Sequence, residues 1–468
     1  MAVIEVDKKP VTGAGPFNGV LTWIDQRFPL VSMWREHAAD YWAPKNFNFW
    51  YYFGSLALLV LVIQIVTGIF LTMNYKPDAK EAFASVEYIM REVNWGWWIR
   101  YMHSTGASFF FICVYLHMFR GLLYGSYRRP RELVWMVGML IFLSLMAEAF
   151  FGYLLPWGQM SYWGAQVIVN LFDAIPVIGP KLAIWIRGDY VVSDATLNRF
   201  FAFHVIAVPL VLLGLVVAHL LALHEVGSNN PDGVEIKKTK DAATGHPIDG
   251  VPFHPYYTVK DSFGASVFLV IFFVVVFFLP EMGGYFLESN NFIPADPLKT
   301  PPHIAPVWYF TPFYSILRAT TDNFVYFGLI PGVVLLALAI IVTVPRTAVR
   351  VSVAVLAALL LAGFLGFEAK VWGVVLMGVS VLIYFFLPWL DRSPVRSIRY
   401  KGPFYKIALA LFVVAFFVLG YLGTQPVSTG RTVLAQVCTA VYFLFFAVMP
   451  WYSRFDKTQP EPERVTWK

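Results

Sequence analysis

The chain has 468 residues, of which 58% are hydrophobic and 14% are charged, and its mean hydropathy is +0.62. This composition excludes an ordinary soluble domain and indicates an integral membrane protein. The net charge of +6 gives no argument for nucleic-acid binding, because the basic residues lie in short loops between apolar segments. The first forty residues show no short apolar core with a small-residue cleavage site, so we expect no cleavable signal peptide.

Two cysteines occur, Cys113 and Cys438, and both lie in apolar runs. Their positions match no zinc or iron–sulfur pattern. We therefore expect two buried thiols and no disulfide.

Ten apolar segments are long enough, or nearly so, to cross a membrane as helices. They cover residues 53–73, 104–124, 133–155, 200–223, 263–280, 326–344, 351–367, 371–387, 407–422 and 433–450. The predicted fold is an all-α integral membrane protein with an N-terminal four-helix bundle followed by C-terminal transmembrane helices.

The remaining segments complete the predicted domain order. It comprises an N-terminal segment at 1–48, the bundle at 49–225, a loop at 226–262, a C-terminal transmembrane region at 263–452 and a tail at 453–468. We expect a surface helix at 20–31 and two structured loops. The loop 157–197 has amphipathic pieces around 167–174 and 181–186, and the loop 281–314 is rich in proline.

Basic residues gather in alternate loops, which predicts the orientation in the membrane. They follow the second, fourth, sixth and eighth spans: Arg128, Arg129, Arg131, Lys237, Lys238, Lys240, Arg346, Arg350, Arg392, Arg396, Arg399, Lys401 and Lys406. With the N-terminus on the same side, both termini are cytoplasmic. The other loops then face the periplasm of a bacterial inner membrane.

Four histidines lie in two of the spans as matched pairs, His103 with His117 and His204 with His219. Histidine inside a membrane span is costly and usually functional. Residues 14 or 15 apart return to roughly the same helix face, about 21 Å along the axis. Both helices run in the same direction, so they offer two layers of paired imidazoles. Each layer can hold one haem by both axial positions, which predicts two haems stacked across the bilayer.

Glycines repeat the histidine spacing on the other two helices of the bundle. Gly54 and Gly68 are 14 residues apart on the first span, and Gly138 and Gly152 are 14 apart on the third. A flat macrocycle needs close backbones, which glycine permits. Ordinary small-residue packing explains a single glycine equally well, but two matching spacings less so.

Three arginines lie near the predicted haem layers. Arg100 precedes His103, Arg199 precedes His204, and Arg120 follows His117. They are candidates to bind the haem propionates. Arginines at helix ends also extend to the membrane surface, and the two roles can coexist.

Several long motifs make the chain resemble the cytochrome b family of the respiratory quinol:cytochrome c oxidoreductase. They are RYMHSTGASFFF from Arg100, LLPWGQMS from Leu154, RFFAFH from Arg199, GSNNP from Gly227, FHPYY from Phe253 and TPPH from Thr300. The resemblance extends from about residue 46 to residue 451.

The resemblance implies the protonmotive quinone cycle. Quinol is oxidised on the periplasmic side, and one electron passes to a Rieske-type iron–sulfur protein and on to a cytochrome c-type subunit. The other crosses a low-potential haem between His103 and His204 and a high-potential haem between His117 and His219. It then reduces quinone near the cytoplasm. The resemblance further implies two non-covalent b-type haems, a homodimeric complex and contact with membrane lipid.

The resemblance also assigns quinone sites. The reduction site maps to His224, Ser228 and Asp261, with Lys260 adjoining. The oxidation site maps to Tyr153, Trp157, Gly158, Tyr314 and the tetrad Pro306, Val307, Trp308 and Tyr309.

The tetrad departs from the common family pattern. Family members often carry glutamate, thought to receive a quinol proton, where this chain has Val307. A replacement carboxylate is therefore expected. The first candidate is Glu148, one turn before Gly152, and the second is Glu281.

Two further departures concern spacing and length. Fourteen residues separate His204 from His219, against thirteen between His103 and His117. The apolar hairpin at 326–367 is extra to the usual eight family spans. It is expected to lie at the periphery and to bind lipid, a partner or another subunit.

Two other functions compete with this one. A secondary transporter also has many spans and intramembrane histidines, although it usually shows internal repeats. A diheme cytochrome of another quinone enzyme would share the histidine layers but lack the loops at 227–231 and 306–309.

Overall fold

The structure is a computed structural model that describes residues 16–29, 33 and 41–466. Within these residues, ten helices are long and apolar enough to cross a membrane. They span Phe49–Thr72, Gly96–Tyr124, Glu132–Leu154, Asp194–Val226, Phe253–Phe278, Asp322–Thr343, Thr347–Gly366, Ala369–Leu390, Pro403–Thr424 and Thr429–Ala447. The predicted all-α membrane architecture is confirmed.

The spans divide into labelled elements. They are η2 (Phe49–Tyr51) with α3 (Tyr52–Thr72), α5 (Gly96–Tyr124), α6 (Glu132–Leu154), α9 (Asp194–Ala202) with η3 (Phe203–Ala207) and α10 (Val208–Val226), η5 (Phe253–Tyr257) with α11 (Thr258–Phe278), α13 (Asp322–Phe324) with η9 (Val325–Leu329) and α14 (Ile330–Thr343), α15 (Thr347–Gly366), α16 (Ala369–Leu382) with η10 (Ile383–Phe386) and α17 (Leu387–Leu390), α18 (Pro403–Thr424) and α19 (Thr429–Ala447). Each overlaps one predicted segment.

Several helices begin earlier than their apolar segments. The second starts at Gly96 rather than residue 104, and the fourth at Asp194 rather than residue 200. At the start of helix α9, the Ser193 amide donates to Thr196 Oγ1 at 3.1 Å, which satisfies one amide group there. Hydropathy marks the membrane core, whereas these helices continue past it.

Shorter helices lie outside the spans. They are α1 (Pro16–Asp25), α4 (Ala82–Arg91), α7 (Gln159–Asp173), α8 (Gly179–Arg187), α12 (Thr311–Ala319) and α20 (Met449–Phe455), with the single turns η4 (Ile236–Lys238), η6 (Met282–Gly284), η7 (Ser289–Phe292) and η8 (Trp308–Phe310). The amphipathic pieces predicted in the loop 157–197 are α7 and α8. The predicted surface helix 20–31 was wrong in its boundaries: α1 ends at Asp25 and a turn follows. Residues 30 and 31 lie outside the described part.

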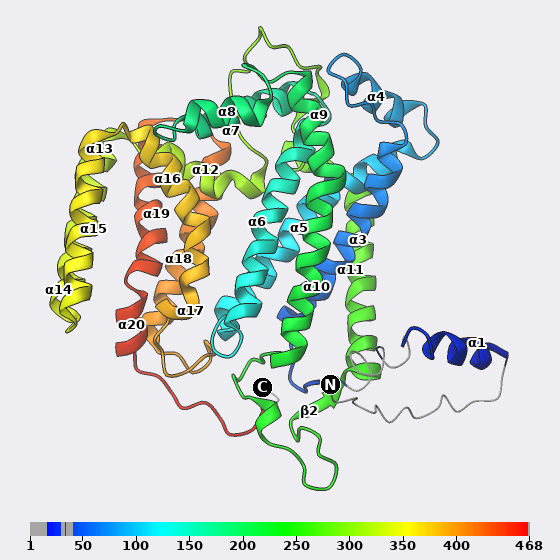
Figure 1. The fold of residues 1–468 in the computed structure, drawn as a ribbon, viewed down its shortest axis with the longest axis vertical. Helices are drawn as coiled ribbons and strands as arrows, with labels where there is room; N and C mark the ends of the chain where they lie inside the picture. Colours follow the sequence, from blue (N-terminus) through cyan, green and yellow to red (C-terminus); the bar gives the residue numbers. More distant parts are fainter. Residues whose placement is uncertain (1–15, 30–32, 34–40, 467–468) are drawn as a thin grey trace.

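Two helical groups form the body of the molecule (Figure 1). In the first, α3 packs against α5 and α6 packs against α10, and α11 covers α3 and α5. In the second, α12 packs against α16, α18 and α19. One hydrophobic core joins the groups. The indole of Trp135 on α6 donates to the carbonyl of Tyr384 on η10 across this junction, at 2.7 Å.

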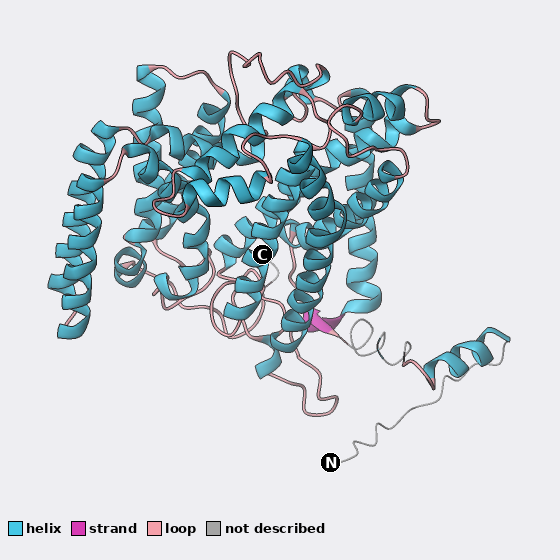
Figure 2. Ribbon diagram, turned by 45° about the horizontal axis from the view of Figure 1, so that its top comes forward, coloured by secondary structure: helices cyan, strands magenta, loops and turns pink. Residues whose placement is uncertain are grey.

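The two ends of the bundle differ. Helices α4, α7 and α8 lie across one end (Figure 1). At the other end, β1 (Trp42–Pro44) pairs antiparallel with β2 (Gly250–Pro252), the small sheet visible in Figure 2. Loops after the second, fourth and eighth spans meet here, because Arg131 and Arg396 both bind Glu235 at 2.7 Å.

The hairpin of α14 and α15 lies at the edge of the molecule (Figure 1). Its attachment includes a small core of Val325, Phe364 and Trp372, the last on α16. The rings of Phe364 and Trp372 have centres 4.3 Å apart. Most of the rest of the hairpin surface is exposed and apolar.

Candidate functional site

The four membrane histidines form two opposed pairs. The ring centres of His103 on α5 and His204 on η3 are 6.0 Å apart, with the rings at 90°. Those of His117 on α5 and His219 on α10 are 6.4 Å apart, at 68°. The structure therefore brings together the two layers that the spacing predicted.

A local change of helix type explains the unequal spacing. Residues Phe203–Ala207 form a π-helical turn, in which the amide of Val208 donates to the carbonyl of Phe203. A π-turn accommodates one extra residue, and it is often found at functional sites. Pro209 follows directly and has no amide hydrogen to continue the α-helical pattern. His204 and His219 therefore face the same side although they are one residue further apart than the α5 pair.

The four glycines lie against the histidines. A methyl group added at Gly54 would lie 3.1 Å from Cε1 of His117, and one at Gly138 would lie 3.2 Å from Cε1 of His219. In the other layer, a methyl group at Gly68 would lie 3.3 Å from Cε1 of His103, and one at Gly152 would overlap the ring of His204. The glycines thus make room for the imidazole rings themselves, a more specific contact than the sequence predicted.

In the layer of His103 and His204, called the first layer from here on, both imidazoles are held through Nδ1. Thr67 Oγ1 lies 3.0 Å from Nδ1 of His103 and donates its own hydrogen to the carbonyl of Ile63 at 2.6 Å. Nδ1 of His204 lies 3.0 Å from both the carbonyl oxygen and carboxylate Oε1 of Glu148. Nδ1–H groups donated to such oxygens leave Nε2 of each ring as the free ligand atom.

The histidine layers fit a metal held between two imidazoles. Two metal–imidazole bonds of about 2 Å each, with about 1 Å from each nitrogen to its ring centre, require ring centres about 6 Å apart. Among the described residues, no group of three or more His, Cys, Asp or Glu side chains is placed to hold a metal ion. A metal in these layers must therefore bring its other ligands with it, as a haem does.

The three candidate arginines occupy different surroundings. Arg120 lies over the ring of Tyr51 at 4.9 Å, and its Nε is buried without a hydrogen-bond partner in the described structure. An anionic carboxylate such as a haem propionate fits such a group. Arg199 is exposed and donates to the carbonyl of Trp185, so its observed contact is at the end of α8.

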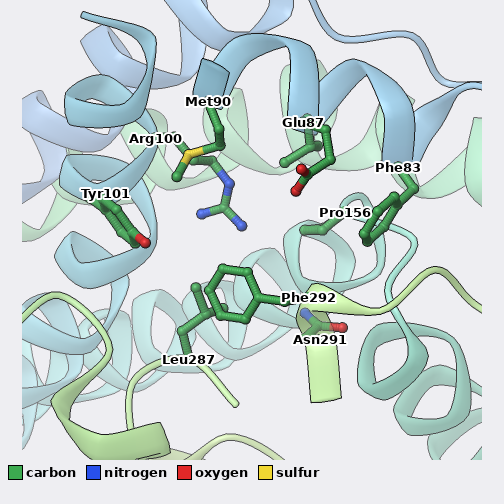
Figure 3. Close-up of a pocket in the computed structure, with 10 residues that line it drawn as sticks. Phe83, Glu87, Met90, Arg100, Tyr101, Pro156, Leu287, Asn291 and Phe292 are labelled. Atoms are coloured by element: carbon green, nitrogen blue, oxygen red, sulfur yellow. The ribbon is translucent and has the colours of Figure 1, made fainter. Parts of the chain in front are cut away.

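Arg100 points into a pocket between α4, α5 and the loop that follows α11 (Figure 3). The pocket is lined by Phe83, Val86, Glu87, Met90, Arg100, Tyr101, Pro156, Leu287, Asn291 and Phe292. Residues of α4 line it, and Arg100 is one helical turn from His103. An anionic group entering here would meet the Arg100 guanidinium.

The predicted oxidation-site residues at the end of α6 lie in a constrained turn. Trp157 has a φ of 53°, a left-handed conformation that is uncommon without glycine. A methyl group at Gly158 would overlap Asn291. The Asn291 Oδ1 accepts from both the amide and the hydroxyl of Ser161 at 2.9 Å, which fixes the start of α7. Strained conformations of this kind cluster at functional sites.

The tetrad from Pro306 to Tyr309 is packed against α5. Val307 is buried among hydrophobic residues. The indole of Trp308 donates to Ser108 Oγ at 3.0 Å, and the ring of Tyr309 stacks on Phe111 with centres 3.9 Å apart. These contacts hold the tetrad beside the helix that carries His103 and His117.

Tyr314 lies one turn further, on α12. Its hydroxyl donates to the carbonyl of Ile304 at 3.4 Å, and the Arg318 guanidinium lies 5.1 Å from its ring centre. Tyr314 therefore ties the segment before the tetrad to α12.

A carboxylate that the sequence did not single out lies in this region. The Tyr153 hydroxyl donates to Glu288 Oε2 at 2.8 Å. Burial raises the pKa of Glu288 to about 7, and the Tyr153 hydrogen bond opposes that rise. Burial and the nearby Glu288 carboxylate raise the pKa of Tyr309. Of the predicted candidates, Glu281 accepts from Tyr101 at 3.3 Å, and Glu148 contacts His204.

The predicted reduction-site residues lie at the opposite end, around Tyr41. The Tyr41 hydroxyl lies 3.2 Å from Ser228 Oγ and accepts from the Ser228 amide at 3.1 Å. The rings of Tyr41 and His224 have centres 4.7 Å apart. Tyr41 is positioned by the small sheet, because the Phe253 amide donates to its carbonyl at 2.8 Å.

Lys260 and Asp261 lie in the first turn of α11. The Lys260 ammonium donates to the carbonyl of Phe47 at 3.3 Å and lies 5.3 Å from the ring centre of Tyr257. Asp261 lies beside Ser55 of α3. The segment before α3 thus contacts the predicted reduction site at two points. Tyr41 contacts His224 and Ser228, and the carbonyl of Phe47 accepts from Lys260.

Two family profiles match the sequence, described as Cytochrome b/b6/petB over residues 38–227 and as Cytochrome b(C-terminal)/b6/petD over residues 294–443. The chain belongs to the cytochrome b family. It is 59% identical to Cytochrome b of Allochromatium vinosum, over 95% of this chain and 98% of that protein. It is 45% identical to Cytochrome b of Rickettsia prowazekii, over 95% and 97%. A solved chain of "Hyperthermophilic respiratory Complex III" is similar with a TM-score of 0.76 and 37% identity, over 92% of this chain and 98% of that one.

Membership of the cytochrome b family decides between the functions considered from the sequence. The chain is a multi-pass, haem-binding protein of electron transport, and the secondary-transporter alternative was wrong. Both the N-terminal and the C-terminal family profiles match. This match also disfavours a diheme cytochrome of another quinone enzyme, which would lack the C-terminal loops.

Three residues that contact the predicted site residues were not identified from the sequence. Tyr41 precedes α3 in a stretch with no periodicity, and Thr67 is an ordinary polar residue of an apolar helix. Glu288 lies in a loop, where carboxylates are usually solvated. No local signal distinguishes them, because each acquires its role only through a distant partner.

Proposed function

We propose that this chain is the diheme cytochrome b subunit of a quinol:cytochrome c oxidoreductase in a bacterial inner membrane. It oxidises quinol on the periplasmic side and reduces quinone on the cytoplasmic side, and this cycle generates a proton-motive force. The observation that carries the proposal is the pair of imidazole layers, with ring centres 6.0 Å and 6.4 Å apart along the same two helical segments.

In this proposal, His103 and His204 hold the low-potential haem, and His117 and His219 hold the high-potential haem. When bound, the b-type haems supply one-electron transfer across the low-dielectric interior. The protein orients His103 and His204 through Nδ1 and removes side-chain bulk beside all four histidines at the four glycines. Arg100 and Arg120 are the better placed propionate partners, and Arg199 remains a candidate.

Quinol oxidation is assigned to the region between the end of α6 and the tetrad. Tyr153, Trp157, Gly158 and Tyr309 are assigned to this region, and the buried Val307 and the partly buried Trp308 give it an apolar wall. Glu148 and Glu281, the two carboxylates predicted from the sequence, are candidates for the residue that accepts a quinol proton.

Quinone reduction is assigned to the end of the bundle near Tyr41. The imidazole of His224 and the hydroxyl of Ser228 are suited to bind a quinone carbonyl, and Asp261 and Lys260 to supply protons. Tyr41 touches both His224 and Ser228, so it belongs to the proposed site.

The orientation follows from the basic loops. Arg131, Arg396 and Glu235 gather at the end of the bundle that carries the small sheet. Basic loops remain on the cytoplasmic side, so this end and both termini are assigned to the cytoplasm. The end covered by α4, α7 and α8 is then periplasmic.

Partners are proposed from the similarity to a chain of a respiratory Complex III. Quinol oxidation needs a second one-electron acceptor besides the haem layers. A Rieske-type iron–sulfur protein and a cytochrome c-type subunit fill that role, and the complex is proposed to be a homodimer. The hairpin of α14 and α15 is assigned to contact lipid, a partner or another subunit, because its apolar surface is exposed.

A redox-titrated difference spectrum, with a quinol-dependent cytochrome c reduction assay on the same purified complex, tests the function. We expect two b-type signals at different potentials, together with turnover. A single b-type signal would contradict the two-layer assignment. Two signals without turnover in a complex that retains its partner subunits would contradict the assignment of quinol oxidation.

A further inference from the structure

Oxidation of a quinol releases protons, and the side chain of Val307 cannot accept one. This inference rests on the proposed function: each quinol loses two electrons and two protons. The side chain at position 307 is buried and has no titratable group. A base must therefore lie elsewhere in the site, because a proton cannot be released into an apolar pocket without an acceptor.

The described loop between α11 and α12 offers three carboxylates, and α6 offers Glu148. Asp296 is exposed and its Oδ1 accepts from the amide of Leu298 at 2.9 Å. Glu281 contacts Tyr101, and Glu148 contacts the imidazole of His204. Glu288 accepts a hydrogen bond from the hydroxyl of Tyr153, a residue assigned to the oxidation site.

Glu288 lies between two elements of that site. Tyr153 reaches it from the end of α6, and Tyr309 of the tetrad is close enough for the carboxylate to raise its pKa. Among the described residues, these two tyrosines are the titratable groups that interact with Glu288. The preceding residue, Leu287, lines the pocket that holds Arg100 and Asn291 (Figure 3). Glu288 thus contacts the oxidation site, and its chain neighbour Leu287 lines a pocket at the proposed periplasmic end.

The geometry points to Glu288 as the proton acceptor for quinol oxidation, in place of the acidic residue absent at Val307. One quinol proton leaves with the electron that passes to the iron–sulfur partner of the proposed function. The second quinol O–H bond breaks as its proton forms an O–H bond on the Glu288 carboxylate. The two electrons pass to the two one-electron acceptors of the proposed function. The resulting carboxylic acid then releases its proton toward the periplasmic pocket, which restores the carboxylate.

The ionisation of Glu288 suits this role. Burial raises its pKa to about 7, so it accepts and releases a proton near neutral pH. The Tyr153 hydroxyl holds the ionised form by donating a hydrogen bond to it. Tyr153 is therefore a positioning residue for the acceptor.

The test uses the complete complex with Glu288→Gln, which keeps the shape and removes the base. We expect kcat for quinol-dependent cytochrome c reduction to fall about 100-fold or more, with both b-type signals kept. Asp296→Asn in the same loop is the matched control and should retain the wild-type rate. Adding Val307→Glu to Glu288→Gln should recover much of the lost rate, because it restores a carboxylate to the proposed oxidation site.

A pH profile gives an independent readout. The wild-type rate should rise with pH through about 7, as Glu288 ionises. In Tyr153→Phe the lost hydrogen bond no longer favours the carboxylate, so the rising limb should move to higher pH. This variant tests the proposal even if Glu288→Gln fails to assemble.

Three outcomes overturn the inference while leaving the proposed function intact. They are a Glu288→Gln complex with the wild-type rate, a tenfold or greater loss in Glu148→Gln or Glu281→Gln but not in Glu288→Gln, and a pH profile unmoved in Tyr153→Phe. Failure of the proposed function is distinguishable, because the wild-type complex itself would then lack quinol turnover.

Discussion

Carboxylate Oε1 of Glu148 lies 3.0 Å from Nδ1 of His204, although the two residues belong to different helices. The same nitrogen lies 3.0 Å from the backbone carbonyl oxygen of Glu148. A carboxylate on the outer nitrogen of a ligating imidazole fixes the ring orientation and raises its basicity. In the proposed haem site, this contact would hold the His204 ring, so we propose a positioning role for Glu148, besides the role of proton acceptor that the sequence predicted.

Glu148→Gln separates these two roles. If Glu148 positions His204, the imidazole becomes less basic without the charge, and the midpoint potential of the first-layer haem should rise. Turnover should then fall by no more than roughly 10-fold, the lower range for residues behind a metal ligand. Redox titration of both b-type signals measures the shift, with the His117–His219 signal as internal control. An unchanged potential with a much larger loss of turnover would favour the acceptor role instead.

The close contacts between the glycines and the histidine rings predict that a substitution at one glycine removes one haem and leaves the other. In Gly152→Ala the new methyl group would overlap the His204 ring, so the first-layer b-type signal should be lost or strongly reduced. The second layer should survive, because Gly54 and Gly138 are unchanged. Haem content per protein and the difference spectrum measure this effect.

Gly214→Ala is the matched control for that experiment. Gly214 lies on α10, and a methyl group there would meet no atom within 4 Å. Both b-type signals should stay at wild-type levels. Equal haem loss in the two variants would mean that helix packing, rather than the histidine contact, accounts for the effect.

The π-turn at Phe203–Ala207 predicts that haem binding survives a one-residue deletion in the π-turn but not in α5. Deleting Ile206 shortens the His204–His219 spacing from 15 to 14 residues, the spacing of the α5 pair. A regular α-helix then presents both histidines on one face, so both b-type signals should remain. Deleting Ile112 from α5 removes a residue from a regular helix and rotates His103 against His117 by about 100°. That variant should lose at least one signal in the difference spectrum, and retention of both would contradict the proposed role of the π-turn.

The sequence by itself determined the spans, the histidine layers and the glycine rows. A membrane span must satisfy its own backbone hydrogen bonds and present apolar side chains to lipid, so each leaves a long local signal. The 14-residue spacings are likewise local, because helix geometry converts them directly into shared faces. For this reason, ten spans and both imidazole pairs could be predicted before any contact was known.

Only the tertiary structure decided which polar residues meet. Glu148 and His204 are 56 residues apart, and Tyr153 and Glu288 are 135 apart. Periodicity carries no information across such distances, since each contact depends on how separate helices and loops pack. Tyr41 reaches Ser228 in the same way, through the pairing of two short strands. The π-turn also required the structure, because a one-residue difference in spacing does not reveal which hydrogen bonds absorb it.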